Sequence, residues 1–197
     1  AMAATPRFTV GINLWSQATS WSDMLAAARL ADELGYEHLW TWDHLHAIVG
    51  DPQQSIFEAY VTLGAWASAT ARIRLGLMVG ANTFRNPGLV AKSIVTLDHA
   101  SNGRAILGIG GAWFDYEHER HGFEFGASIG ERLDWLEESV RAMRTLLDGG
   151  SVTSEPGAHY RFEDLAHAPR PVQRHLPIIE RKSTRLNSSH EGISRMP

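Results

Sequence analysis

The sequence predicts an α/β fold in which helices cover a parallel sheet. Short apolar segments alternate with segments of helical period along most of the chain, and the strand-like segments begin near residues 8, 37, 73 and 104 with a helical segment between each pair. Helical crossovers of this kind join parallel strands. The strand-like segments are apolar almost throughout, as expected of strands that are covered on both faces.

The first strand and helix are clearly marked. Residues 7–15 (RFTVGINLW) form the first apolar segment, and Ser20 and Asp23 have the spacing of a capping box at the start of a helix. Gly35 is typical of the position just beyond a helix C-terminus. The residues expected on the inner face of this helix are Met24, Ala27, Ala28, Ala31 and Leu34.

Three further units follow the same plan. The predicted strands are residues 37–42 (EHLWTW), 73–79 (IRLGLMV) and 104–110 (RAILGIG), and the first helix between them is residues 57–70. Asn86 and Pro87 supply an N-cap and a first-turn proline for the next helix. Ser128 and Glu131 again have capping-box spacing, which predicts a longer helix from about residue 130 to Gly149. The inward positions expected in these three helices are Tyr60, Leu63, Gly64 and Ala67; Val90, Ile94 and Leu97; and Leu133, Leu136, Val140, Met143 and Leu147.

Two architectures accept this pattern, an open doubly wound sheet and a closed (β/α)8 barrel. A dinucleotide-binding G-x-G-x-x-G motif that began at Gly108 would need glycine at position 113, which is Trp113. The residues that could take part in a reaction instead follow strand ends. In a barrel these ends meet at one mouth, where active sites are found. We therefore predict the (β/α)8 barrel, of which about the first four to five βα units are present.

Composition narrows the classes of function. The chain has 197 residues, a net charge of -4, no block of like charge before its C-terminal segment and no cysteine. These values give no electrostatic basis for binding nucleic acid or an anionic membrane, and they exclude disulfides and zinc-thiolate sites. No apolar segment approaches the roughly 20 residues that span a bilayer. We expect a cytoplasmic protein that acts on a small molecule.

The segment WTWDHLH, which ends the second strand, carries the strongest chemical signal. His44 lies just beyond the strand, and the preceding Asp43 could fix its tautomer, an arrangement suited to proton transfer near neutral pH. A loop-capping Asp43 beside a half-buried His44 is the alternative. His44 and His46 have the spacing of a metal pair, but the third and fourth strands offer no further ligands, so we predict no metal. EHERH at residues 117–121 is interpreted as a solvated helical face.

Two glycine-containing segments suggest a binding surface. Gly76, Gly80 and Gly88 lie around the end of the third strand together with Asn82, where a flat ligand ring could approach the main chain. An ordinary strand-to-helix loop explains them equally well. GIGGAWF places Trp113 at the mouth, where its indole would either line a pocket or pack the loop.

Three segments together resemble one family: LADELGYEHLWTWDHL, NPGLVAKSIVTLDHASNGRAILGIGGAWFDYEHERHGFEF, and GERLDWLEESVRAMRTLL with YRFEDLAHAPRPVQRHLPI. They are similar to the luciferase-like monooxygenase superfamily, and most of all to its coenzyme F420-dependent oxidoreductases, over about residues 8–179. The resemblance implies hydride transfer at a deazaflavin or flavin ring held at the barrel mouth. It implies that Asp43 and His44 are catalytic, with His44 as the acid/base, and that Met78 and Val79 form a bulge with a non-prolyl cis peptide. The cofactor-binding residues that it implies are Met78, Val79, Ala81, Asn82, Gly111 and Ala112.

The resemblance also bears on the reaction. Sugar-phosphate dehydrogenases of the family carry a glutamate proton donor where this chain has Trp113, so we do not expect their reaction. A deazaflavin transfers a hydride and does not activate oxygen, whereas an FMN-dependent member would be a monooxygenase. We favour coenzyme F420, with FMN as the alternative cofactor and an inactive barrel fragment as the alternative function. Trp15, Trp42 and Trp113 are the predicted substrate pocket, which suggests a partly apolar substrate.

The C-terminal part changes character. Residues 151–162 are a predicted hairpin with its turn at Glu155 to Gly157, and residues 171–179 (PVQRHLPII) should begin a fifth strand. The following ERKSTRLNSSHEGISRMP has no period and resembles translated vector sequence. We expect residues 1–180 to be the N-terminal part of the barrel and 181–197 a non-native tail. Because a barrel takes about 250 residues, we expect the first and fifth strands to expose unpaired edges unless a second chain, as in a homodimer, covers them, and cofactor binding to be weak or absent.

Overall fold

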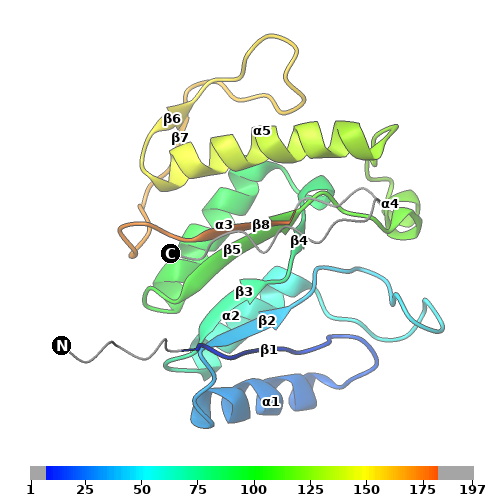
Figure 1. Ribbon diagram of the computed structural model, residues 1–197, viewed down its shortest axis with the longest axis vertical. Helices are drawn as coiled ribbons and strands as arrows, with labels where there is room; N and C mark the ends of the chain where they lie inside the picture. The colour runs from blue at the N-terminus through cyan, green and yellow to red at the C-terminus, as the bar shows by residue number, and fades with distance from the viewer. Residues whose placement is uncertain (1–7, 182–197) are drawn as a thin grey trace.

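The computed structural model describes residues 8–181, which form a curved parallel sheet with helices on its outer face (Figure 1). The strands of this sheet are β1 (Gly11–Asn13), β2 (His38–Thr41), β3 (Arg74–Leu77), β4 (Gly80–Ala81), β5 (Ala105–Gly110) and β8 (Ile178–Arg181). The helices are α1 (Trp21–Glu33), α2 (Ala59–Ala69), α3 (Pro87–Ala100), α4 (Asp115–His121) and α5 (Ile129–Leu147), with a 3₁₀ turn η1 (Asn82–Phe84).

The sheet is parallel throughout. β1 pairs with β2, β2 with β3 and β3 with β5, while β8 pairs with the other edge of β5. β4 also pairs with β5, so β3 and β4 are two pieces of one strand interrupted at residues 78 and 79. The predicted succession of βα units is confirmed. Among residues 8–181, β1 pairs only with β2 and β8 only with β5, as expected for the edges of this sheet.

Side-chain caps set the helix starts as the sequence predicts. Ser20 accepts a hydrogen bond from the Asp23 N–H and Ser128 accepts one from the Glu131 N–H. Asn86 caps α3, which begins with a proline in its first turn. Gly35 follows α1 with a positive φ of 82°, a conformation that favours glycine at this position.

The core lies between the sheet and the helices. Met24, Leu63, Ile94 and Leu136 are buried with the outward-facing side chains of β2, β3 and β5. One inward prediction is wrong: Leu34 is 66% exposed, because α1 ends at Glu33 and Leu34 is its C-cap. The large side chain that fills the core from α2 is Trp66, which is fully buried.

Polar side chains fasten the amino ends of the strands. The Asp32 carboxylate, in the last turn of α1, accepts hydrogen bonds from the backbone N–H groups of residues 71–73, just before β3. The Arg104 guanidinium, just before β5, donates to the carbonyls of Ala67, Thr70 and Ile73 and so closes the end of α2. Arg104 thus satisfies carbonyls that the end of α2 leaves without intrahelical partners, and Asp32 satisfies N–H groups of the segment between α2 and β3.

The predicted hairpin is present beyond α5. β6 (Ser151–Val152) pairs with β7 (Leu165–Ala166) in an antiparallel register, so its second strand lies just after the predicted range. The predicted fifth strand is β8, which runs through residue 180 to Arg181. The expected tail was residues 181–197, but Arg181 is the last residue of β8 and pairs with Gly110, so the tail begins at least one residue later than predicted. Residues 182–197 lie outside the described residues. Within residues 8–181, no helix is long and apolar enough to cross a membrane.

Candidate active site

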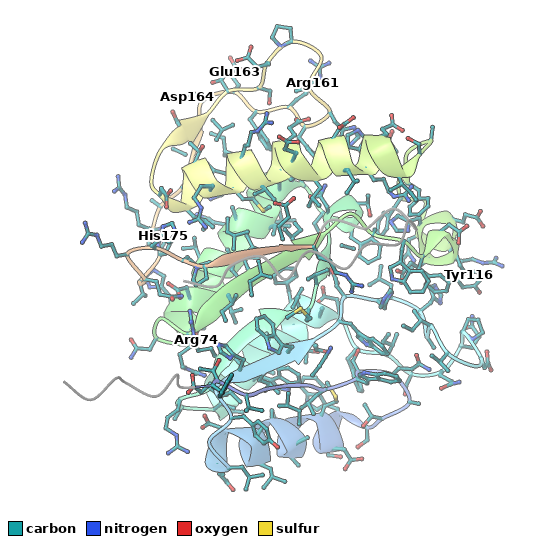
Figure 2. The ribbon with its side chains drawn as sticks, viewed as in Figure 1. Arg74, Tyr116, Arg161, Glu163, Asp164 and His175 are labelled. Carbon is teal, nitrogen blue, oxygen red and sulfur yellow. The ribbon has the colours of Figure 1, made fainter. Side chains whose placement is uncertain are left out.

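The candidate site lies at the carboxyl ends of the strands. Figure 2 shows Tyr116 of α4 at the end toward which the strand arrows point, and Arg74 and His175 at the opposite end. The loop after β2, the start of α4 and the β3–β4 interruption all lie at the Tyr116 end. The prediction that the chemical residues share one end of the sheet is therefore confirmed for His44 and Trp113, whose ring centroids are 5.7 Å apart.

His44 is held by Glu117. The His44 Nδ1 lies 2.9 Å from Glu117 Oε1, and the Leu45 N–H donates to Glu117 Oε2 at 2.9 Å. A carboxylate accepts only, so Nδ1 carries the hydrogen in this pair. No described residue makes a hydrogen bond with His44 Nε2, which leaves that nitrogen available to a ligand. The geometry is that of a carboxylate-oriented imidazole, the arrangement used for general acid/base chemistry.

Asp43 has a different role from the one expected. Its carboxylate pairs with the Arg85 guanidinium through two hydrogen bonds of 2.6 and 3.0 Å and accepts the Ala81 N–H at 2.9 Å. Arg85 also pairs with Glu58, the N-cap of α2. Burial alone would lower the pKa of Arg85, but Asp43 and Glu58 outweigh it and raise that pKa. Asp43 therefore joins the loops after β2 and β4, and the expectation that it fixes the His44 tautomer is wrong because Glu117 does so.

The segment at residues 117–121 is not the solvated face that the sequence suggests. Glu117 and His118 are only 2% and 1% exposed, because α4 packs this side onto the loops after β2 and β4. His118 Nδ1 donates to the Phe114 carbonyl, and its Nε2 accepts from the Thr83 hydroxyl at 2.6 Å. Burial lowers the pKa of His118. The signal for this arrangement was the i, i+1, i+4 spacing of Glu117, His118 and His121 on one helical face.

His46 packs among rings beside the site. Its ring centroid lies 5.3 Å from that of Tyr116 and 5.2 Å from that of His121. In the part of the chain that the structure describes, no group of three or more histidine, cysteine, aspartate or glutamate side chains is placed to hold a metal ion. His46 thus lies outside the pair formed by His44 and Glu117.

A row of aromatic rings passes through His44. Trp15 stacks on Trp42 with centroids 4.6 Å apart, Trp42 meets His44 edge-on at 5.7 Å, and His44 meets Trp113 edge-on at 5.7 Å. Trp15 and Trp113 are 57% and 60% exposed. Trp42 was predicted to line the substrate pocket, but it is buried and its indole N–H donates to Ser16 Oγ. It therefore supports the row from within.

The strand interruption has the expected backbone. The Met78–Val79 peptide bond is cis, and Met78 is 37% exposed beside it. Packing within the protein, and not a ligand, explains why glycine occupies the nearby positions 76 and 80. A Cβ at Gly76 would meet the Trp40 ring at 2.6 Å, and one at Gly80 would meet the Gly108 carbonyl at 3.0 Å. The protein's own packing therefore requires these glycines, and the interpretation in terms of ligand approach is not supported.

The remaining predicted cofactor residues differ in accessibility. Ala81 and Ala112 are half-buried, and Ala112 has a positive φ of 60° where the chain turns from β5 toward α4. Gly111 is buried and faces Leu133 of α5, so its prediction as a cofactor-lining residue is weakened. Asn82 is also buried: its Nδ2 donates to the Tyr160 hydroxyl, and its Oδ1 has no hydrogen-bond partner among residues 8–181. Asn82 therefore tethers the residue 153–164 loop to η1.

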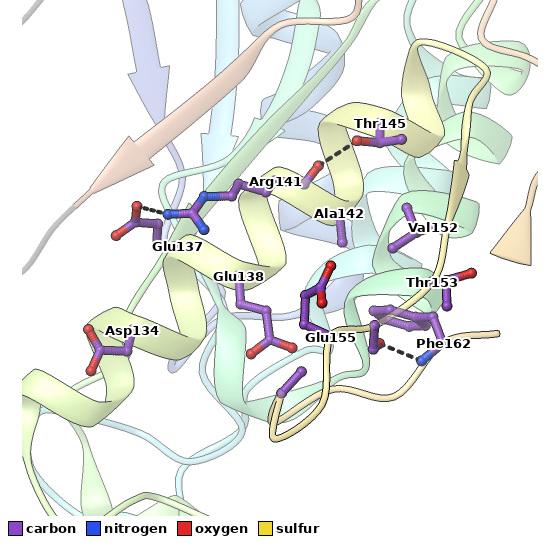
Figure 3. Close-up of a pocket in the computed structure, with 12 residues that line it drawn as sticks. Asp134, Glu137, Glu138, Arg141, Ala142, Thr145, Val152, Thr153, Glu155 and Phe162 are labelled. Carbon is purple, nitrogen blue, oxygen red and sulfur yellow. Dashed lines mark hydrogen bonds and ion pairs between the residues drawn. The ribbon is translucent and has the colours of Figure 1, made fainter. Parts of the chain in front are cut away.

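A hollow lies on the outer side of α5, away from the His44 site. It has a volume of about 520 Å³ and is lined by α5 and the loop that follows β6 (Figure 3). Four of its lining residues are acidic, namely Asp134, Glu137, Glu138 and Glu155. Glu138 accepts hydrogen bonds from the backbone N–H groups of residues 159 and 160, so it fastens the loop. None of the residues that line this hollow belongs to the His44 site.

Comparison with known proteins assigns the family. The sequence profile described as luciferase-like monooxygenase matches residues 7–180. The chain belongs to the luciferase-like monooxygenase family. The (β/α)8 prediction agrees with solved structures of this family: a monooxygenase from Streptomyces bottropensis has a TM-score of 0.72 at 30% identity and matches 88% of this chain and 53% of its own. An F420-dependent secondary alcohol dehydrogenase has a TM-score of 0.78 at 24% identity over 87% of this chain and 51% of its own.

Curated proteins similar to this luciferase-like chain include both uncharacterized and F420-dependent proteins. An uncharacterized protein of Mycobacterium tuberculosis is 32% identical over 78% of this chain and 58% of its own length. An F420-dependent glucose-6-phosphate dehydrogenase of Amycolatopsis mediterranei is 31% identical over 77% of this chain and 45% of its own. The chain spans about half the length of the curated relatives it matches. Its family is one of oxidoreductases, and its curated relatives include two proteins that are named as F420-dependent dehydrogenases.

The residues at the mouth fit a flat heterocyclic cofactor. Met78 and Trp113 are exposed apolar side chains just beyond the carboxyl ends of β3 and β5, and they offer apolar contacts to a flat ring. The free Nε2 of His44 lies in the same region. This luciferase-like site thus combines an apolar surface with one proton-transfer group.

Proposed function

We propose that this chain carries the proton-transfer and ring-binding part of an F420-dependent oxidoreductase that acts on a small organic substrate. The observation that carries the proposal is the His44 imidazole, whose Nδ1 is held by the buried Glu117 while Nε2 has no partner among residues 8–181. The relatives that are at least 30% identical and named as F420-dependent support this cofactor.

The side chains supply the proton half of an oxidation. When a carbinol is oxidised, the C–H leaves as a hydride and the O–H leaves as a proton. A bound deazaflavin supplies the chemistry of accepting or returning that hydride. His44 Nε2 takes the hydroxyl proton, and the Glu117 carboxylate stabilises the imidazolium that results. In the reverse direction, the same nitrogen returns the proton to the carbonyl oxygen.

Other residues would hold the cofactor ring and keep the site in shape. Met78, Val79 and Ala81 offer apolar atoms at the strand interruption. The Asp43–Arg85 pair fixes the Ala81 N–H and joins the loops on which His44 and Ala81 lie. Because Arg85 neutralises Asp43, Glu117 is the carboxylate that interacts with His44.

An FMN-dependent monooxygenase is the second candidate. It is supported by the 30% identical monooxygenase from Streptomyces bottropensis and by a 35% identical monooxygenase of Streptomyces nodosus that matches 51% of this chain. The two candidates use the same family fold and differ in the cofactor taken up.

Cofactor titration separates the candidates. The 197-residue chain is titrated with coenzyme F420, with its riboflavin-level fragment that lacks phosphate, with FMN and with riboflavin, and the bound ligand is followed by visible absorption and fluorescence. The proposal expects the two deazaflavins to bind with similar, weak affinity, because the residues assigned to the cofactor would contact its ring and none is assigned to the phosphate-bearing tail. Selective uptake of FMN would favour the monooxygenase, and uptake of none would favour an inactive fragment.

The role of His44 is tested by His44→Ala with His46→Ala as the matched control, since both histidines follow β2 and are half-buried. Loss of a general acid/base slows the chemical step by about 100- to 10,000-fold. We expect this loss for His44→Ala alone, with deazaflavin affinity changed much less. Equal losses of rate and affinity would make His44 a structural residue.

A further inference from the structure

The aromatic row carries information about the substrate. His44 contacts two of its rings, Trp42 and Trp113, each of which meets the imidazole edge-on with centroids 5.7 Å apart. Stacked rings extend the row at both ends, Trp15 on Trp42 and Phe114 on Trp113. The proton-transfer group is thus in contact with two indoles, and a substrate that reaches Nε2 must pass close to them.

Two tryptophans of the row are exposed, while a third is buried and held by a hydrogen bond. Trp15 and Trp113 are each more than half exposed, and no described residue takes a hydrogen bond from either indole N–H. Trp42 between Trp15 and His44 is buried and bound to Ser16. Large exposed aromatic side chains on a rigid support are typical of binding surfaces, because such rings contribute large contact areas at low entropic cost.

The backbone also directs Trp113 to this position. Ala112 has a positive φ of 60°, which is uncommon for a residue with a Cβ and turns the chain sharply between β5 and α4. The Phe114 carbonyl is then held by His118 Nδ1. Trp113 lies between these two constraints, so its exposure is built into the loop.

Two arginines of this region, Arg85 and Arg120, contact other side chains, and Arg181 lies at the carboxyl end of β8. Arg85 is paired with Asp43 and Glu58, and Arg120 lies over the Tyr116 ring at 5.1 Å. A site for a sugar phosphate needs a cation or a group of N–H donors aimed at the anion. The row around His44 instead presents aromatic faces.

We propose that Trp15 and Trp113 are specificity-determining residues that bind the flat, apolar part of an aromatic alcohol or ketone and bring its oxygen to His44 Nε2. This inference rests on the proposed function for the reaction at that oxygen, but the binding of the aromatic part is independent of the cofactor. Stacking and edge contacts with the indoles supply the affinity. The hydrogen bond to Nε2 orients the reacting oxygen.

Direct binding tests the proposal without turnover. The 197-residue chain is titrated with acetophenone, acetone and glucose 6-phosphate by calorimetry and by ligand-observed NMR, with and without the phosphate-free deazaflavin. We expect acetophenone to bind at least 10-fold more tightly than acetone, and glucose 6-phosphate not to bind. Equal binding of acetophenone and acetone, or preference for glucose 6-phosphate, would overturn the proposal.

Three variants assign the effect to the row. Trp15→Leu and Trp113→Leu should each weaken acetophenone at least 10-fold, whereas Trp21→Leu, an exposed tryptophan at the start of α1 whose ring packs on Phe57, should leave it unchanged. Circular dichroism checks that all three fold. If Trp113→Leu abolishes deazaflavin binding and spares acetophenone, the indole serves the cofactor and the proposal is wrong. If acetophenone binding depends on the row while no deazaflavin binds, the inference stands and the proposed function fails.

Discussion

Replacing Glu117 by glutamine tests the contact on which the site depends. The carboxylate is 2% exposed and accepts two hydrogen bonds of 2.9 Å, from His44 Nδ1 and from the Leu45 N–H. A glutamine side chain has one acceptor oxygen, so one of these donors loses its partner. A hydrogen bond to a charged group contributes about 1.5–3 kcal/mol. We expect the free energy of unfolding of Glu117→Gln to fall by about that amount.

Two measurements check this expectation, with Glu119→Gln as the control because Glu119 is exposed on the same helix. Thermal unfolding should show a midpoint about 3–12 °C lower for Glu117→Gln, since 1 kcal/mol corresponds to roughly 2–4 °C in a domain of this size. Nitrogen-15 NMR should show that His44 no longer carries its hydrogen mainly on Nδ1. An unchanged His44 tautomer together with a stability equal to that of Glu119→Gln would refute the role assigned to Glu117.

Three further outcomes follow from the structure. Burial lowers the pKa of His118 below its unfolded value of about 6.5. The stability that neutral His118 contributes is therefore fully present above about pH 6.5 and is lost as the pH falls from that value toward the folded pKa. Urea titrations from pH 7.5 to 5 should show a shallower decline in stability for His118→Gln than for wild type. Arg85→Met leaves the buried Asp43 without its counter-ion and should cost about 3–5 kcal/mol in guanidinium unfolding, a loss that the double variant with Asp43→Asn should partly reverse. Gly108→Ala would place a Cβ 1.9 Å from a backbone oxygen of β3 and should prevent folding, whereas Gly64→Ala, whose Cβ meets nothing within 4 Å, should stabilise α2 by about 0.5–1 kcal/mol; soluble, equally stable proteins in both cases would contradict the packing described for β5.

Local signals predicted most of the framework. The capping residues Ser20, Asn86 and Ser128 begin α1, α3 and α5 because a side-chain cap acts within three residues of its own position. Alternating apolar segments located the strands because burial on both faces selects apolar residues. The family resemblance, rather than the period, located the cis bond at Met78–Val79.

The partners of the site residues could not be predicted in the same way. Glu117 lies 73 positions from His44, and the charged composition of residues 117–121 is typical of a solvated helix. Asp43 precedes His44 in the chain, which made it the natural candidate partner, yet successive side chains at a strand end point in different directions and Asp43 pairs with Arg85. Which aromatic rings are buried, as Trp42 is, depends on packing between units that are distant in sequence.

The contacts of Asp32 and Arg104 stabilise the amino end of the sheet, whereas the candidate site lies at its carboxyl end. They close the amino ends of β3 and β5 with hydrogen bonds to backbone groups, at the end opposite to Trp15 and Trp113. Backbone partners persist when neighbouring side chains change. The exposed indoles at the mouth can therefore be exchanged, by selection or by design, while the anchored end preserves the scaffold; under the proposed role of these indoles, such exchanges would change the substrate.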